Sequence, residues 1–277
     1  MYIGAHVSIA GGVFNAPENA HKIGCECFQM FTRSPQGGPS PVLDKKIVSS
    51  FKAGFKKNKQ KAFYVHTPYY INLASSKNRI RYGSIKVIRD DLERASLLGA
   101  KALMTHLGSS KDLGSQEALK QVIKGIGKIL EGYKGETQFL IENSAGAGGT
   151  IIGDDFKEIG QIIKAYPQHN IGVCLDTCHA FVSGYNLRSK QAVQETLKQF
   201  DKEIGLDKLK MVHVNDTKSE LGSHKDRHEH IGYGKIGKDG FHSLLHHPRL
   251  KNIDFILETP PDKNISDIKL LKNLRKK

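Results

Sequence analysis

Long hydrophobic segments are absent from this sequence. No apolar run comes near the roughly 20 residues that a membrane-spanning helix needs, and the mean hydropathy is −0.41. The first residues, MYIGAHVSIAGG, also lack the basic and apolar regions of a secretory signal, so we interpret them as a first strand. These absences argue against a membrane protein and predict a cytoplasmic one.

Cysteine is scarce as well. The four cysteines, Cys25, Cys27, Cys174 and Cys178, fall in C-x-C and C-x-x-x-C pairs. This spacing matches neither a disulfide framework nor the C-x-x-C pattern of many zinc sites. Because free cysteines commonly behave as small hydrophobic residues, we expect four buried free thiols that do not bind metal.

Acidic residues are few relative to basic ones. The chain has 28 Asp and Glu against 42 Lys and Arg, which gives a net charge of +14. Such a charge attracts phosphate backbones through counterion release and long-range steering. It indicates a polyanionic partner, with a merely solvated basic surface as the alternative.

Short apolar segments recur along the 277 residues at intervals that suit a repeated strand, loop, helix and loop. Eight such segments are present: Tyr2–Val7, Cys25–Phe31, Ala62–His66, Ala102–His106, Gln138–Glu142, Gly172–Asp176, Leu209–Val214 and Asp254–Glu258. The last four contain near-continuous apolar runs, which are typical of strands buried on both faces of a parallel sheet.

Amphipathic stretches lie between these segments. The clearest is Arg79–Leu98, whose apolar residues follow helical spacing and which Gly99 terminates. The others are Leu43–Lys57, Gln116–Leu130, Asp154–Ala165, Lys190–Ile204 and Ile265–Leu274. Eight strands alternating with helices favour a single α/β TIM barrel over residues 1–277, rather than an open doubly wound sheet.

Charged and imidazole side chains stand at the ends of the predicted strands. These residues are His66, His106, Glu142, Asp176, His213 and Glu258. A barrel brings the carboxyl ends of all its strands to one face, so the six side chains should share one cavity. Buried carboxylates crowded together repel one another unless cations hold them. The pattern therefore predicts a metal site.

Two further pairs add candidate ligands. His179 follows Asp176 in the segment DTCH, and Asp226 precedes His228 by two residues, a spacing at which extended residues face the same way. Nine candidate ligands exceed one tetrahedral site, which indicates two or three metals that share a bridging carboxylate. Imidazole and carboxylate donors without thiolate suit Zn²⁺, with Mn²⁺ or iron as substitutes.

Four segments resemble the signature stretches of the endonuclease IV family, a group of metal-dependent abasic-site endonucleases. They are GAHVSIAGG (residues 4–12), LDTCHAFVSGY (175–185), VHVNDTKSELGSHKDRHEHIGYGKIG (212–237) and ILET (256–259). The resemblance covers essentially the whole chain. It implies a barrel with three zinc ions that cleaves duplex DNA on the 5′ side of abasic sites, leaving a 3′-hydroxyl and a 5′-deoxyribose phosphate.

The same resemblance implies a division of the ligands. His66 and His106 would bind one zinc, Asp176, His213 and Glu258 a second, and His179, Asp226 and His228 the third, with Glu142 bridging the first two. It further implies attack on the phosphorus by a hydroxide that the metals activate. Glu142 would orient this hydroxide as the catalytic residue, or act only as a bridge.

Recognition in the family implies a bent duplex, a flipped abasic nucleotide and loop side chains that fill the gap. Tyr69 and Tyr70 are candidates for that wedge, with ordinary loop packing as the alternative. Many members have an Arg and a Trp where this chain has Gln36, Gly37 and Gly38. We expect Arg33 and Arg227 to compensate as DNA contacts.

Two other functions compete with this interpretation. A TIM-barrel sugar isomerase or epimerase also uses divalent metal at strand ends, but it needs neither Asp226 and His228 nor a charge of +14. A basic nucleic-acid-binding module with a structural metal would have a closed, cysteine-rich site. We expect a monomer without an obligate protein partner, acting on duplex DNA that contains abasic sites.

Overall fold

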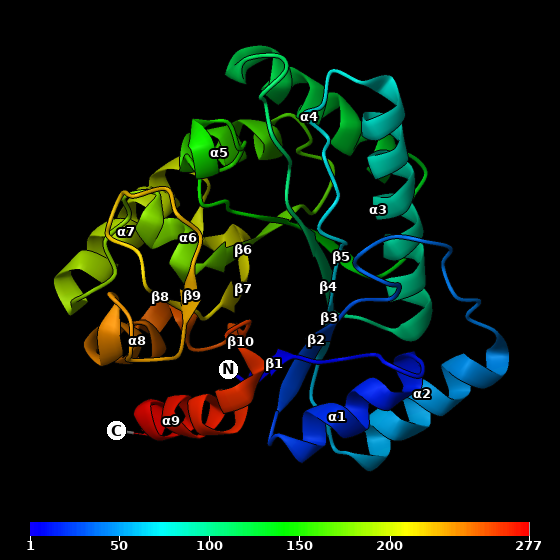
Figure 1. The fold of residues 1–277 in the computed structure, drawn as a ribbon, viewed down its shortest axis with the longest axis horizontal. Helices are drawn as coiled ribbons and strands as arrows, with labels where there is room; N and C mark the ends of the chain where they lie inside the picture. Colours follow the sequence, from blue (N-terminus) through cyan, green and yellow to red (C-terminus); the bar gives the residue numbers. More distant parts are fainter. Residues whose placement is uncertain (277) are drawn as a thin grey trace.

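The computed structural model describes residues 1–276, and its centre is a closed barrel of eight parallel strands (Figure 1). The strands are β1 (Ile3–His6), β2 (Cys27–Met30), β3 (Phe63–His66), β4 (Ala102–Thr105), β5 (Gln138–Glu142), β6 (Gly172–Asp176), β7 (Leu209–His213) and β10 (Asp254–Leu257). They follow one another around the barrel in chain order, and β10 pairs with β1 to close it. The predicted TIM barrel and its eight strands are confirmed.

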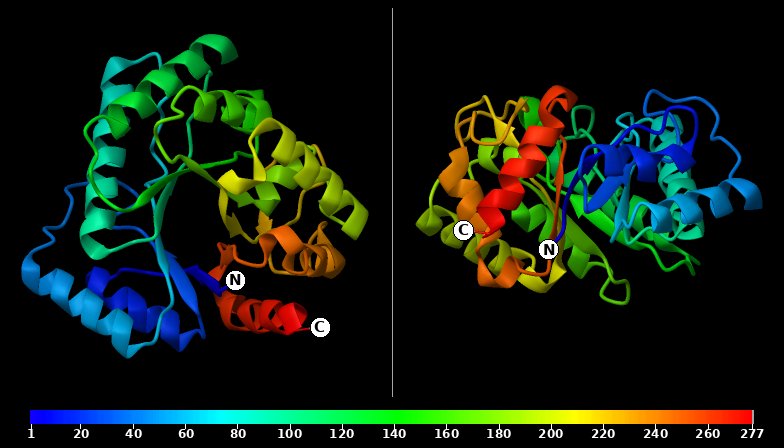
Figure 2. Two further views of the ribbon diagram at one scale, coloured as in Figure 1. Left: turned by 180° about the vertical axis from the view of Figure 1, so that it is seen from behind. Right: turned by 90° about the horizontal axis from the view of Figure 1, so that it is seen from below.

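Helices surround the barrel (Figure 2). They are α1 (Ala16–Lys22), α2 (Lys45–Lys57), α3 (Asn78–Leu98), α4 (Ser115–Leu130), α5 (Phe156–Lys164), α6 (Thr177–Val182), α7 (Lys190–Glu203), α8 (Gly237–Leu245) and α9 (Asn264–Lys276). In α9, Arg275 donates to the Met1 carbonyl at 3.1 Å and to Glu26. The last helix thus contacts the beginning of the chain.

Local sequence signals begin and end several helices. Asp44 and Ser189 cap α2 and α7 by accepting backbone N–H groups at 2.8 and 3.2 Å. Gly99 ends α3 with φ +90°, a left-handed conformation that glycine adopts without steric cost. Gly4 on β1 serves close packing instead, because a Cβ there would lie 1.7 Å from the Cys27 carbonyl oxygen.

The inside of the barrel consists of stacked layers. A buried apolar layer contains Cys27, Tyr64, Ala102, Met104, Leu140, Cys174, Met211 and Ile256. Because side chains alternate along a strand, the residue two positions further on faces the same interior. That next layer, called here the polar layer, comprises Gln29, His66, His106, Glu142, Asp176, His213 and Glu258. Outside the strands, a larger apolar core packs the helices onto the barrel.

Three helices and a hairpin went unpredicted. Helices α1, α6 and α8 are short, with seven, six and nine residues. Strands β8 (Asp216–Thr217) and β9 (His228–Glu229) pair antiparallel within the long polar loop.

No helix among residues 1–276 has both the length and the apolar character that crossing a bilayer requires. The four cysteines are buried free thiols, as predicted.

Candidate metal centre

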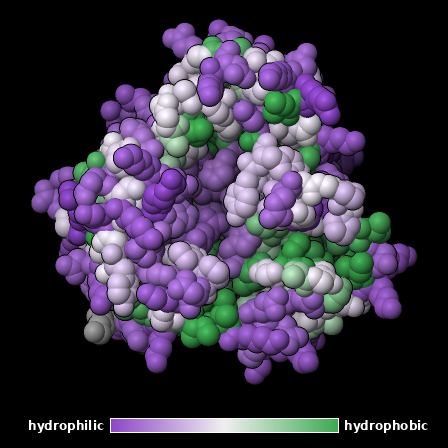
Figure 3. All heavy atoms as spheres, in the orientation of Figure 1, coloured by the Kyte–Doolittle hydropathy of each residue, from purple (hydrophilic) through white to green (hydrophobic). Residues whose placement is uncertain are grey.

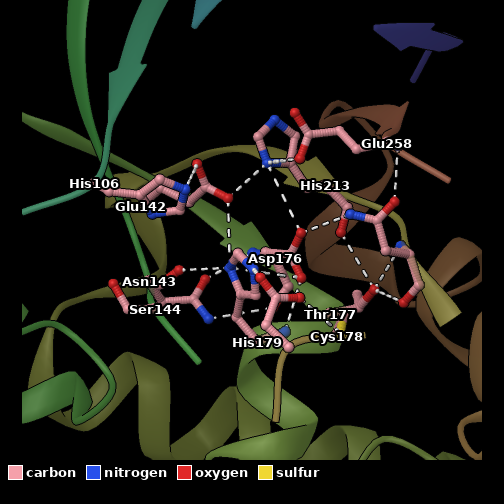
Figure 4. A network of polar contacts seen from close by, with 12 residues as sticks. His106, Glu142, Asn143, Ser144, Asp176, Thr177, Cys178, His179, His213 and Glu258 are labelled. Atoms are coloured by element: carbon pink, nitrogen blue, oxygen red, sulfur yellow. Dashed lines mark hydrogen bonds and ion pairs between the residues drawn. The ribbon is translucent and has the colours of Figure 1, made fainter. Parts of the chain in front are cut away.

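The nine predicted ligands come together near the carboxyl ends of the barrel strands. Figure 4 labels His106, Glu142, Asp176, His179, His213 and Glu258 among them. Their donor atoms form three groups: His66, His106 and Glu142; Glu142, Asp176, His213 and Glu258; and His179, Asp226 and His228. Within each group, the donor atoms lie within 4.8 Å of one another. Glu142 belongs to the first two groups, the position that the resemblance implies for a bridging carboxylate.

Glu142 is the centre of the site. Its Oε2 lies 2.9 Å from His66 Nε2 and 3.5 Å from His106 Nε2. Its Oε1 lies 2.9 Å from His213 Nδ1. Both oxygens of a fully buried carboxylate are therefore surrounded by ring nitrogens from three different strands or strand ends, with no lysine or arginine among these partners.

The third group depends on α6 and on the β8–β9 hairpin. Asp176 caps α6 by accepting the His179 N–H at 2.8 Å, which places His179 one turn beyond the strand end. His179 Nε2 lies 3.3 Å from Asp226 Oδ2, and His228 Nε2 lies 3.2 Å from Asp226 Oδ1. The hairpin thus brings two residues from a polar loop to a site that is otherwise built from strand ends.

One thiol also reaches this region. Cys178 Sγ, Asp176 and His228 form a further group of potential donor atoms, and the sulfur lies 3.8 Å from Asp226 Oδ1. The sequence pattern predicts no cysteine among the ligands, and it gives no sign that a thiol would come this near. This proximity could not be predicted, because Cys178 lies on the first turn of α6, a helix too short to recognise in the sequence.

The charges of the site are compatible with bound cations. Burial raises the pKa of Glu142, but His106 and His213 outweigh it and hold that pKa well below its usual range. Burial alone lowers the pKa of His66, whereas Glu142 raises it above its ordinary value. The protein by itself thus balances buried carboxylates with protonated imidazoles, and divalent ions would serve the same purpose.

A buried nitrogen supports the same conclusion. His228 Nε2 forms no hydrogen bond, although it lies 3.2 Å from Asp226 Oδ1 and buried polar atoms are nearly always hydrogen-bonded. A metal ion would satisfy this nitrogen, because neutral imidazole is a common ligand of transition metals. The residues present therefore fit metal binding at all three groups.

Neutral amides hold the ligands in place. Gln29 donates from Nε2 to Glu258 at 2.6 Å, so its Oε1 must accept from His213 Nε2 at 2.7 Å. This contact fixes the His213 proton on Nε2 and leaves Nδ1 free to bind a metal. Asn215 donates to Asp176 Oδ2 at 2.6 Å and accepts the Glu258 N–H at 2.7 Å. Gln29 also contacts His6 at 2.9 Å.

Another acidic residue organises the hairpin loop. The Asp216 carboxylate accepts backbone N–H groups from Gly232, Gly234 and Ile236 at 2.9 to 3.0 Å. It lies outside the ligand groups. Its signal in the sequence is the run of glycines in IGYGKIG, which leaves the backbone free to wrap around one carboxylate.

A pocket of about 430 Å³ opens above the ligands. His106, His179 and Asp226 line it together with the two predicted wedge residues and the glycine-rich loop that includes Ser144, Ala145 and Ala147. In Figure 3, hydrophilic residues gather around a hollow in the middle of the molecule, where Figure 1 shows the barrel. Tyr69 and Tyr70 are 72% and 42% exposed, so neither ring is committed to the core.

This structure does not expose Arg33 for the predicted DNA contact. Its side chain is buried, and it donates to Asp91 at 2.8 Å and also to Asp90. Asp91 is completely buried as well, so the pair belongs to the packing between the loop after β2 and helix α3. Arg227 is exposed, and its guanidinium bonds only to the Asp226 carbonyl among the residues described.

Comparison with known proteins bears on the whole chain. A family model described as a xylose isomerase-like TIM barrel matches residues 17–274. Probable endonuclease 4 of Nitrosopumilus maritimus is 41% identical over all of this chain and 98% of its own length. That of Halothermothrix orenii is 39% identical over 98% of this chain and 99% of its own. The chain belongs to the endonuclease IV family.

Structural comparison agrees with this membership in the endonuclease IV family. The crystal structure of endonuclease IV from Thermus thermophilus matches 100% of this chain and 99% of its own, with a TM-score of 0.89 and 33% identity. A D-tagatose 3-epimerase-like protein has a TM-score of 0.74 at 18% identity, with 100% and 97% of the two chains covered. The second likeness shows only that both proteins share the barrel fold.

Proposed function

We propose that this protein is a DNA-repair endonuclease that cleaves the phosphodiester bond 5′ to abasic sites in duplex DNA. The products would be a 3′-hydroxyl and a 5′-deoxyribose phosphate. One observation carries the proposal: three groups of metal ligands, two of them joined by Glu142, lie beneath an open pocket in a member of the endonuclease IV family. Proton transfer on a sugar would not require the third group.

Each part of the site has a task in this reaction. Bound divalent ions would supply an activated water at neutral pH and stabilise negative charge on the departing oxygen. His66, His106, His213, Asp176, Glu258 and Glu142 would hold two of them, and His179, Asp226 and His228 the third. Glu142 presents both oxygens to the centre, so it is placed to bridge ions and to orient the attacking water.

The side chains around the pocket would select the substrate. Tyr69 and Tyr70 stand at its edge and are sufficiently exposed to enter a gap in a base stack. Arg227 on the hairpin loop is available for a phosphate. A net charge of +14 favours encounter with DNA from a distance.

The remaining assignments follow from the same proposal. Imidazole and carboxylate donors suit Zn²⁺, and we assign three zinc ions, for which Mn²⁺ or iron could substitute. We also propose that the protein acts in the cytoplasm. We propose that the active species is a monomer, because one chain supplies all nine ligands.

Incision of a labelled duplex that carries one abasic-site analogue tests the proposal. The metal-loaded protein should cut 5′ to the analogue, and treatment with chelator or the substitution Glu142→Ala should abolish cutting. Glu136→Ala, at an exposed position outside the site, is the matched control and should cut normally. A folded protein that holds about three metals but does not cut would contradict the proposal and direct attention to sugar phosphates.

A further inference from the structure

A second hollow adjoins Tyr70. Its volume is about 750 Å³, and it is lined by Tyr70, Lys77, Arg79, Ile80, Gly83, Ser84 and Val87, all but Tyr70 from the start of α3 or the residue before it. We call it the Tyr70 groove. Tyr70 also lines the pocket above the ligands, so the groove and the pocket share one wall.

The Tyr70 groove is electropositive. Lys77 and Arg79 are exposed, and neither forms an ion pair with a carboxylate within residues 1–276. The first turn of α3 contains no acidic residue that would offset them. Nearby, Arg81 donates to the Ser75 carbonyl at 2.8 Å, which fixes the turn that presents Lys77. The two cations are thus displayed at the surface without a partner.

The neighbouring loop leaves this groove accessible. Residues 34–42 contribute no arginine or lysine, and the preceding Arg33 is occupied by Asp90 and Asp91. Gly37 lies beside the Tyr70 ring, where a Cβ would be 3.8 Å from the ring. The glycine keeps the space beside the ring free of a side chain, and the cations that line the groove are Lys77 and Arg79.

We propose that the Tyr70 groove binds the sugar-phosphate backbone of duplex DNA on one side of the cleavage point. Lys77 and Arg79 contact successive phosphates, while Tyr70 and Ile80, which is 41% exposed, cover the apolar face of the sugars. The inference rests on the proposed function, since it assumes DNA in the adjoining pocket. Continuity with that pocket and complementary charge favour DNA over a protein partner.

A double substitution, Lys77→Ala with Arg79→Ala, tests the groove. Its control is Lys52→Ala with Lys56→Ala, which removes two exposed cations from α2 and leaves the same net charge. Both metal-loaded variants are assayed for incision of abasic duplex between 50 and 200 mM KCl. The slope of log kcat/KM against log salt should become shallower by about 1 for each groove residue. The control should keep the slope of the unmodified protein.

A series of duplexes shortened from either end locates the contact. Shortening the duplex on one side of the abasic site should reduce kcat/KM for the unmodified protein and for the control. The same shortening should reduce kcat/KM of the groove variant much less. Charge reversal, Lys77→Glu with Arg79→Glu, should weaken incision more than the alanine variant, and thermal melting checks that each variant is folded.

Several results would overturn the inference. The first is a groove variant whose salt slope and arm-length dependence equal those of the control. The second is a change in sedimentation without a change in incision, which would assign the groove to a second copy of the chain. If the unmodified protein holds metal yet cuts no DNA, the proposed function fails together with the groove; if it cuts and only the slopes are unchanged, the groove alone fails.

Discussion

The polar layer inside the barrel and the loops around its mouth differ in how their side chains are held. In the polar layer, His66, Glu142 and His213 are buried, and each makes hydrogen bonds within 2.9 Å. At the mouth, Tyr69 and Tyr70 are exposed, and so are Lys77 and Arg79 at the start of α3. A site for small ions needs ligands fixed to fractions of an ångström. A site for a long, deformable polymer needs charged and exposed side chains that can adapt to it.

The largest effect should come from removing Glu142, the carboxylate at the centre of the polar layer. Glu142→Ala should lower kcat for abasic-site incision by roughly three orders of magnitude, because it withdraws a ligand shared by two groups and a metal ion contributes several kcal/mol. Metal content measured by emission spectrometry should fall as well. Normal kcat in the variant would show that Glu142 is not part of the reaction centre.

Arg33 differs from the other residues near the mouth, because it lies on a loop but is buried like a core residue. Arg33→Ala should destabilise the fold by about 3 kcal/mol, because it removes the arginine that donates to the buried Asp91 carboxylate and leaves only Thr32 and the more distant Arg94. Urea unfolding monitored by circular dichroism measures this loss. At a temperature where the variant is folded, its KM for abasic duplex should be unchanged, and a raised KM would restore Arg33 as a DNA contact.

Gln29 tests whether the neutral amides position the ligands. Gln29→Leu should weaken metal binding roughly 10- to 100-fold, the usual effect of losing a hydrogen bond behind a ligand, because His213 Nε2 loses its acceptor. The absorption spectrum of the cobalt-substituted protein should change too, which a purely structural role would not produce. Gln29→Asn or Gln29→His, which keep a polar partner, should restore part of the affinity.

The smallest effects belong to the exposed rings. Tyr69→Ala or Tyr70→Ala should raise the KM for abasic duplex by about tenfold, in line with the loss of one base-aromatic contact. Stability should hardly change, since both rings are largely solvent-exposed. Tyr233→Ala removes another ring of 72% exposure away from the pocket and serves as the control. Equal KM values for all three variants would contradict the predicted wedge role of Tyr69 and Tyr70.

The sequence alone determined the barrel and the set of residues at its centre. Strands buried on both faces read as apolar runs, and a His, Asp or Glu directly at the end of such a run stands out against it. His66, Glu142 and Asp176 could be placed in one cavity because a closed parallel barrel leaves the ends of its strands no other place to point. The approximate ranges of α2, α3 and α7 followed from periodicity, and Gly99 also indicated the end of α3.

Only the tertiary structure decided the partners of these residues. Gln29 looks like any polar residue in β2 until the closed barrel brings it against β7 and β10. Arg33 looked like a free cation because Asp90 and Asp91 lie almost 60 residues away in the chain. Contacts between distant segments leave no local pattern, since hydrogen bonds and ion pairs depend on where the folded backbone places each group. The sequence therefore determined which chemistry is present, and the fold decided which groups are free to use it.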